Sequence, residues 1–333
     1  MNHSKRDQQP QRLSNVDLLK WIVIQCLVAA SAIPLGLFLF ALLGRFYFFA
    51  ELVGHFRFQI TLMLVAALFI LIVFKRKILG GLTAVALTIS VMGGLWVYLP
   101  LPANQPPPGS EIIKVMSFNV LAGNRQSKLV LEEIARSDPD FVSILEYSGT
   151  QHQRLDELKE RYPYHARHPR WHGFGIAVFS KRPLSNTKVH QLTEGQTDCP
   201  MIITEVEVGG RSIRLAAVHV VSPTSRLRMD VRNQQLIEVA DHLVQQDIPT
   251  VVMGDFNCTP WSPFLQDFTQ VTGYRDSREG FGQQSTWRAD VWWLQIPIDH
   301  AFVSDDIYVH SRVVGNPAGS DHMPIVLEIS RTE

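Results

Sequence analysis

Cysteine is scarce in this sequence, with only three in 333 residues. Cys26 lies inside an apolar run, so only Cys199 and Cys258 remain in the rest of the chain. Cysteine is among the most buried residue types, so we expect two free thiols in a packed core. A disulfide between them stays open, without support from the sequence. Zinc-binding spacings such as HExxH or CxxC are also missing, which argues against a zinc site.

Acidic residues are scarce in the first third of the chain. Residues 1–110 carry nine Lys or Arg but only three acids, which leaves 22 basic and 28 acidic residues, a net charge of −6, in the remainder. Proteins that bind nucleic acid without sequence preference usually present a basic face to the phosphates. The charge of the C-terminal part therefore weighs against such a partner without excluding it.

Long apolar runs are abundant in that same first third. A helix needs about 20 apolar residues to cross a bilayer. We predict three transmembrane helices, at about residues 21–43, 58–74 and 78–99. A cleaved signal peptide is the competing interpretation, but the first run is too long for one and two more runs follow it.

The basic residues predict how these helices are oriented. Lys75, Arg76 and Lys77 form a short basic turn between the second and third runs, and four more basic residues precede the first run. Under the positive-inside rule both clusters are cytoplasmic. Three crossings then predict a multi-pass protein of the inner (plasma) membrane, with everything after Leu99 periplasmic or otherwise extracytoplasmic. The lipid bilayer is the expected partner, and no protein partner is predicted.

A proline-rich stretch, residues 100–110, is predicted to be an extended linker between the membrane anchor (1–99) and one soluble domain (111–333). Apolar runs typical of strands alternate there with helical patterns at about 127–137, 151–161 and 227–246. Two packed sheets with helices outside would satisfy this α/β pattern. The eight expected strands are 112–120, 141–147, 175–181, 201–208, 213–221, 250–257, 298–304 and 323–329.

Polar side chains able to bind metal or phosphate lie at or near the ends of these runs, where functional sites are commonly built. Each alone could be a cap or turn residue. Together they supply oxygen ligands for a hard cation, a carboxylate able to orient water and imidazoles able to face a phosphate. The set comprises Asn119, Glu146, His219, Asp255, Asn257, Asp299, Asp321 and His322.

These residues stand in motifs whose order resembles the endonuclease/exonuclease/phosphatase superfamily. The most specific pair is GDFN at 254–257, followed about 65 residues later by SDHMP at 320–324. The resemblance spans about residues 112–329 and implies a four-layer α/β/β/α sandwich. It also implies a metal-dependent hydrolase of phosphoester bonds, using Mg²⁺ with Mn²⁺ as an alternative.

The resemblance further implies a role for each residue. Glu146 would bind the metal, with Asn119 beside it and Asp321 within reach. Asp255 would activate the attacking water, and Asn257 would hold a phosphate oxygen or the nucleophile. His322 would pair with Asp299 and polarise the phosphate. His219 would stabilise the transition state or protonate the leaving oxygen.

Leu121 departs from the family pattern, because many nuclease members carry an acid at this position. We therefore expect a single-metal site centred on Glu146. Trp287 is a candidate substrate-binding residue, although a core tryptophan would explain it equally well. Three functions remain open: a nuclease or phosphodiesterase, a lipid-head-group phosphodiesterase or phosphatase, and an inactive binding domain.

Overall fold

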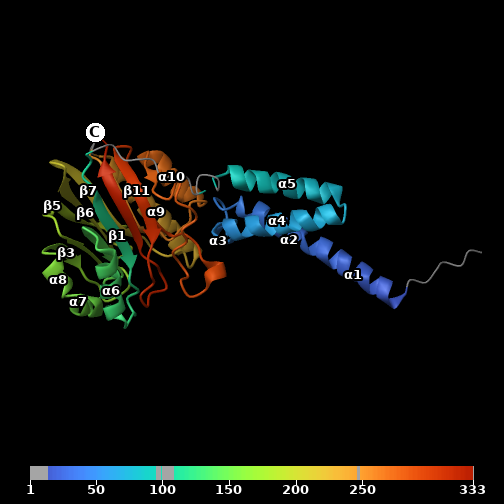
Figure 1. The fold of residues 1–333 in the computed structure, drawn as a ribbon, viewed down its shortest axis with the longest axis horizontal. Helices are drawn as coiled ribbons and strands as arrows, with labels where there is room; N and C mark the ends of the chain where they lie inside the picture. Colours follow the sequence, from blue (N-terminus) through green and yellow to red (C-terminus); the bar gives the residue numbers. More distant parts are fainter. Residues whose placement is uncertain (1–13, 95–98, 100–108, 246–247, 333) are drawn as a thin grey trace, which may run out of the picture.

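The structure is a computed structural model that describes residues 14–94, 99, 109–245 and 248–332. A group of helices formed by the N-terminal third projects from one side of an α/β domain (Figure 1). The predicted linker, 100–110, lies outside the described residues except for Gly109 and Ser110.

The α/β domain contains two sheets of six strands each. The first has the order β11-β12-β1-β2-β4-β3. Its strands are β1 (Ile113–Asn119), β2 (Phe141–Leu145), β3 (Tyr164–His168), β4 (Ile176–Ser180), β11 (Ile307–Val314) and β12 (Ile325–Arg331). β1 and β2 are parallel, and the other neighbours are antiparallel.

The second sheet has the order β5-β6-β7-β8-β10-β9. Its strands are β5 (Ser185–Leu192), β6 (Cys199–Val208), β7 (Arg211–His219), β8 (Thr250–Asp255), β9 (Arg275–Asp276) and β10 (Asp299–Val303). Its single parallel pair is β7 with β8. Each sheet thus carries one parallel pair near its centre, and these two pairs hold the first residues of the site.

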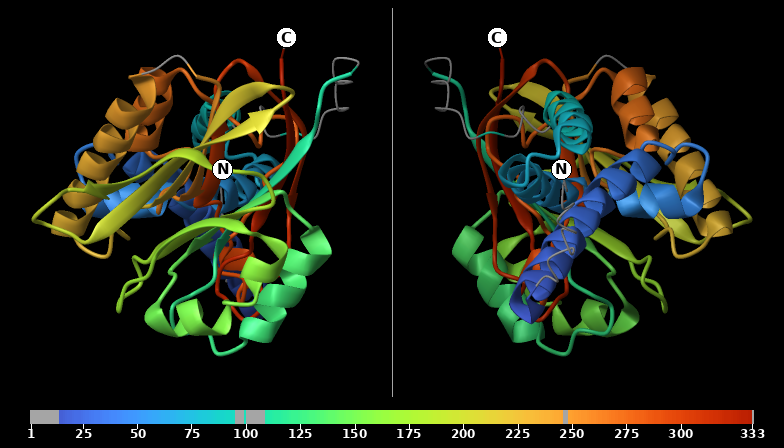
Figure 2. Two further views of the ribbon diagram at one scale, coloured as in Figure 1. Left: turned by 90° about the vertical axis from the view of Figure 1, so that its left-hand side faces the viewer. Right: turned by 90° about the vertical axis from the view of Figure 1, so that its right-hand side faces the viewer.

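Three apolar clusters explain the layering. One lies between the sheets and takes side chains from both. A second packs α6 (Ser127–Ser137), α7 (Gly149–Arg154) and α8 (Leu158–Arg161) on the first sheet, and a third packs α9 (Arg226–Val244) and α10 (Pro263–Thr272) on the second. Figure 2 shows the green and the orange helices on opposite sides of the sheets. The predicted two-sheet sandwich with helices outside is confirmed.

Within residues 14–94, the chain forms five helices instead of the three predicted spans: α1 (Asn15–Ala30), α2 (Ala32–Ala41), α3 (Phe48–Gly54), α4 (Arg57–Val73) and α5 (Lys77–Met92). Among the described residues, only α1 and α2 together, Asn15–Ala41, make a helix of 27 residues that is long and apolar enough to cross a membrane. α3 and α4 are bent by 71° against each other, and α5 is too short to qualify. The structure therefore supports one candidate span, or two if the bent pair counts as one, and the prediction of three is not supported.

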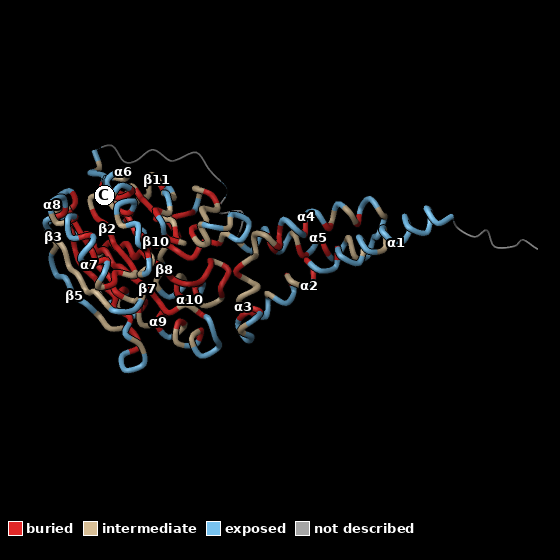
Figure 3. The backbone as a smooth tube through the Cα atoms, turned by 90° about the horizontal axis from the view of Figure 1, so that it is seen from below, coloured by how far each residue is buried: buried red, intermediate tan, exposed pale blue. Residues whose placement is uncertain are grey.

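The largest apolar contact among these helices is a narrow seam formed mainly by α2, α4 and α5. Much of their remaining apolar surface is exposed, including Phe69 (69%), Ile72 (65%) and Ile78 (84%) (Figure 3). Contiguous exposed apolar surface of this kind marks a contact with a membrane or another protein.

Candidate active site

The parallel strand pairs bring four of the predicted residues to the same end of the sandwich. Asn119 ends β1 and Glu146 directly follows β2, its parallel neighbour. His219 ends β7 and lies in register with Asp255, which ends β8. Because the carboxyl ends of parallel strands meet at one edge, residues far apart in the sequence converge.

The backbone is held in sparsely populated conformations at this edge. Glu146 and Asn257 have positive φ angles of 56° and 49°. Gly254 has a φ of 152°, and a Cβ atom there would collide with the carbonyl oxygen of Val218. Such strain costs on the order of 1–3 kcal/mol per residue and is concentrated at functional sites.

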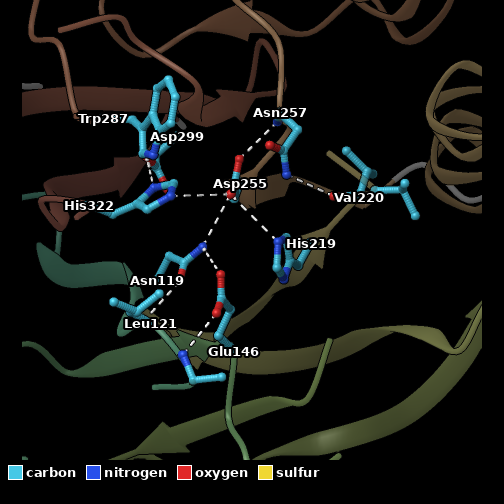
Figure 4. A network of polar contacts seen from close by, with 12 residues as sticks. Asn119, Leu121, Glu146, His219, Val220, Asp255, Asn257, Trp287, Asp299 and His322 are labelled. Carbon is cyan, nitrogen blue, oxygen red and sulfur yellow. Dashed lines mark hydrogen bonds and ion pairs between the residues drawn. The ribbon is translucent and has the colours of Figure 1, made fainter. Parts of the chain in front are cut away.

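Asn119 links the two sheets across the site (Figure 4). Its Nδ2 donates to Glu146 Oε1 at 3.1 Å and to Asp255 Oδ2 at 3.2 Å. Its Oδ1 accepts from the backbone N–H of Leu121 at 3.1 Å, which orients the amide. The backbone N–H of Ala122 donates to Glu146 Oε2 at 2.8 Å. The main chain around Leu121 thus fixes both the Asn119 amide and the Glu146 carboxylate.

Asp255 is the centre of the charged network. It is buried, its Oδ1 accepts from the backbone N–H of Asn257 at 2.8 Å, and its Oδ2 lies 3.6 Å from His219 Nε2 and 3.8 Å from His322 Nε2. His322 Nδ1 lies 2.9 Å from Asp299 Oδ2. β10 runs antiparallel to β8 with Asp299 directly opposite Asp255, so the sheet itself places the two carboxylates side by side.

Burial and charge separate the protonation behaviour of these groups. Burial and the neighbouring Asp299 raise the pKa of Asp255 to about 8. Burial lowers the pKa of His322, but Asp299 and Asp255 outweigh it and raise the value to about 10. Burial and the charge of His322 lower the pKa of His219 to about 3. His322 is therefore the imidazolium of the site, while His219 is neutral and suited to hydrogen bonding.

Asp321 and Trp287 line the cavity together with His322. Trp287 Nε1 donates to Asp321 Oδ2 at 3.0 Å, and the Trp287 ring centroid lies 6.4 Å from that of His322. Asp321 Oδ1 is buried, and no described residue donates a hydrogen bond to it. Asn257 Nδ2 donates to Val220 O at 2.9 Å, which fixes its amide beside Asp255.

A cavity of about 490 Å³ connects these residues. Seven of the nine predicted site residues line it, while Asn119 and Asp299 lie behind and hydrogen-bond to the lining residues. The cavity is also lined by Leu52, His55 and Phe56 of the N-terminal segment. These three residues lie between the predicted helices at about 21–43 and 58–74, and no motif in the sequence marks them.

The residues of the site suit a hard divalent cation. Among the described residues, Asp255, Asp299 and His322 offer ligand atoms within 4.8 Å of one another, a group that differs from the predicted ligands Glu146, Asn119 and Asp321. Counting both sets, four carboxylates face one imidazolium. This excess of negative charge, with the unpaired Asp321 Oδ1, fits a cation that prefers oxygen ligands.

Cys199 and Cys258 are free and buried, in the same apolar cluster under α9 and α10. The expectation of two unpaired core thiols is confirmed.

Solved structures with the same fold include an endonuclease/exonuclease/phosphatase from Beutenbergia cavernae DSM 12333 (20% identity, TM-score 0.54, covering 67% of this chain and 72% of that one). D. rerio TDP2 complexed with single strand DNA product is 16% identical (TM-score 0.57, covering 66% and 99%). The human Nocturnin catalytic domain with bound sulfate anion is 23% identical (TM-score 0.54, covering 69% and 100%). None of the curated proteins compared with this chain matches it.

At these identities the solved structures establish the fold alone. The family model adds the sequence evidence, because it matches residues 116–322, more than half of the chain, and includes every predicted site residue. Members of that family are hydrolases acting on phosphoester bonds. The chain belongs to the endonuclease/exonuclease/phosphatase family.

Proposed function

We propose that this protein is a Mg²⁺-dependent phosphoesterase that hydrolyses phosphodiester or phosphomonoester bonds. The observation that carries the proposal is the contact of Asp255 with Asn119, His219 and His322 in one buried network beside a cavity. An inactive binding domain would tolerate loss of a catalytic side chain, but all of those implied by the family motifs are present.

Asp255 is the proposed general base. Its raised pKa makes the carboxylate a stronger proton acceptor than an ordinary aspartate, which suits removal of a proton from water near neutral pH. The water oxygen attacks phosphorus in line, the bond from phosphorus to the leaving oxygen breaks, and that oxygen takes up a proton from solvent. The positive charge of His322, held by Asp299, offsets the charge that develops on the phosphoryl oxygens.

Glu146, Asp321 and the amide of Asn119 are the proposed holders of the cation, with Asp255 and Asp299 close by. When bound, a divalent ion supplies Lewis-acid stabilisation of the phosphoryl oxygens. His219 and Asn257 border the same cavity, where both would hydrogen-bond to those oxygens. Trp287 forms an adjoining wall and is the proposed contact for the remainder of the substrate.

We further propose that Asn15–Ala41 anchors the chain in a membrane, with α4 and α5 inserted beside it. The three-span arrangement predicted from the sequence, with the catalytic domain outside the cytoplasm, remains a proposal. It rests on the apolar runs and on the basic turn between α4 and α5.

The test is hydrolysis of bis-p-nitrophenyl phosphate by the full chain with Mg²⁺, with Mn²⁺ and with EDTA. We expect activity with either metal, none in EDTA, and recovery when Mg²⁺ is added back. Asp255→Asn should lower turnover by about 100-fold or more with an unchanged melting temperature, since a positioned base contributes about 10²–10⁴-fold. Exposed Asp305→Asn is the control. Activity that persists in EDTA, or normal turnover by Asp255→Asn, would contradict the proposal.

A further inference from the structure

α3 is attached to the catalytic domain by a buried ion pair. Glu51 of α3 contacts the guanidinium of Arg232 on α9, and both side chains are fully or almost fully buried. Ser262 Oγ donates to the same Glu51 oxygen at 2.7 Å. A buried ion pair is strongly destabilising to break, because the remaining partner is left as an uncompensated charge. The contact therefore holds α3 in one fixed position on the domain.

The attachment reaches the loop that follows the proposed general base. Arg232 Nη1 donates to Asn257 O at 3.2 Å, two residues after Asp255. His55, just beyond α3, lies with Nδ1 3.1 Å from Thr259 Oγ1, and the backbone N–H of Thr259 donates to the same Nδ1 at 3.4 Å. α3 and the Asp255–Thr259 loop thus form one packed unit.

The hydrogen bonds of His55 define its tautomer. Because the backbone N–H of Thr259 can only donate, Nδ1 is the acceptor and the ring proton is on Nε2. Nε2 is buried without a hydrogen-bond partner among the described residues, and His55 lines the active-site cavity. A buried donor left unpaired is unfavourable, and a polar atom of a molecule bound beside His55 would satisfy it.

The rest of this wall is apolar. Leu52 and Phe56 line the cavity from the N-terminal segment, and Phe174, Ile296 and Ile298 line it from the catalytic domain. A charged phosphoryl group is not stabilised by an apolar surface. An alkyl chain, in contrast, gains about 0.8 kcal/mol for each methylene that it buries. The cavity therefore combines a charged end, at Asp255 and His322, with an apolar flank.

Exposed aromatic side chains surround the junction between the helices and the domain. Phe46, Tyr47 and Phe49 are 66%, 59% and 70% exposed. On the domain, Trp292 and Trp293 are 77% and 59% exposed, and their short helix is tied to α4 because Gln59 Nε2 donates to Gln295 O at 2.9 Å. Aromatic residues are enriched where membrane proteins meet the polar surface of the bilayer.

We propose that this cavity takes an amphiphilic phosphoester from the bilayer surface. Its phosphoryl group would lie at Asp255 and His322, its alkyl chain would pass along Leu52 and Phe56 toward α4, and His55 Nε2–H would donate to a polar atom between the two. The inference rests on the proposed function and adds the class of substrate. The N-terminal helices are accordingly a wall of the active site as well as an anchor.

The test compares two phosphodiesters that differ only in chain length, ethyl p-nitrophenyl phosphate and hexadecyl p-nitrophenyl phosphate. The full chain is assayed in phospholipid nanodiscs with Mg²⁺, following release of p-nitrophenol. We expect kcat/KM to be at least about tenfold higher for the hexadecyl ester, since burial of a few methylenes supplies that factor. Leu52→Ser/Phe56→Ser should lower this preference about tenfold relative to the unmodified chain in the same nanodiscs.

The matched control is Phe49→Ser, an exposed aromatic residue of α3 that does not line the cavity, which should leave the preference unchanged. A His55→Ala variant provides a second measurement, with a raised KM for the hexadecyl ester expected. Equal kcat/KM for both esters, an unchanged preference in the double variant, or cleavage of single-stranded DNA in place of the hexadecyl ester would overturn the inference. Failure to hydrolyse either ester would instead count against the proposed function.

Discussion

His322 and Asp299 form a buried pair in which the imidazole Nδ1 lies 2.9 Å from the carboxylate Oδ2. The pair directs His322 Nε2 toward Asp255, at 3.8 Å. Asp299 does not line the cavity, so it acts on the substrate through His322. It is a positioning residue that also keeps the imidazole charged.

Asp299→Asn should therefore affect turnover more than substrate binding. Loss of the carboxylate removes the main attraction that raises the pKa of His322, so a smaller fraction of the enzyme carries the imidazolium. We expect kcat to fall by about 100-fold or more, the scale of general acid–base effects, with KM within about twofold. Steady-state kinetics on bis-p-nitrophenyl phosphate measure this split. A rise in KM with kcat unchanged would show that Asp299 has no such role.

Glu51→Ala should destabilise the chain by about 3–5 kcal/mol, because it leaves the buried guanidinium of Arg232 without its carboxylate. Thermal unfolding of the full chain in nanodiscs measures the loss. A second ion pair between the helices and the domain, Arg45 with Asp267, is about half exposed and serves as the comparison. Asp267→Ala should cost no more than about 1 kcal/mol, as surface pairs do. Equal effects of the two substitutions would argue that Glu51 is not an anchor.

We expect part of the loss of folding stability at low pH to come from a second buried ion pair. Asp276 of β9 and Arg278 of the following turn form this pair. Burial raises the pKa of Asp276, but the attraction and hydrogen bonds of Arg278 outweigh it and hold the pKa well below its usual range. The stabilisation is therefore complete above the unfolded-state value of 3.8 and is lost as the pH falls below it.

Asp276→Asn should accordingly be less stable than the unmodified chain at pH 7 by about 3–5 kcal/mol. The difference should shrink as the pH falls from about 4 toward 2, where the wild-type carboxylate also takes up a proton. Urea unfolding at a series of pH values gives this difference directly. A difference that stays constant down to pH 2, or grows, would contradict the assignment.

The strands that the sequence predicts are the interior strands of the two sheets. All eight expected strands are found, whereas the four that were missed, β3, β5, β9 and β11, are the four sheet edges. Interior strands are covered on both faces and read as apolar runs, which makes them visible in the sequence. Edge strands such as β5, with five consecutive exposed residues from Ser185 to Val189, carry little of that pattern.

Among the helices, too, those with a clear apolar pattern were predicted more accurately. Helices with one apolar face, α6 and α9, begin and end within two residues of their predicted bounds, while the expected helix 151–161 is divided into α7 and α8. The motifs identified eight of the site residues that converge here, and Trp287 was a separate candidate that a core position would have explained equally well. Leu52, His55 and Phe56 could not be found in this way, because tertiary contacts such as those of Glu51 with Arg232 and of His55 with Thr259 bring them to the cavity.

The ion pair between Glu51 and Arg232 implies that a fragment without the N-terminal helices does not keep the active site of the full chain. A fragment starting after the proline-rich stretch would expose Arg232 without its counter-ion, uncover Thr259 and Ser262, and open one side of the cavity. Such a fragment would be easier to keep in solution, but it would lack the residues of the N-terminal segment that line the cavity. Kinetic constants from such a fragment would describe a different binding site.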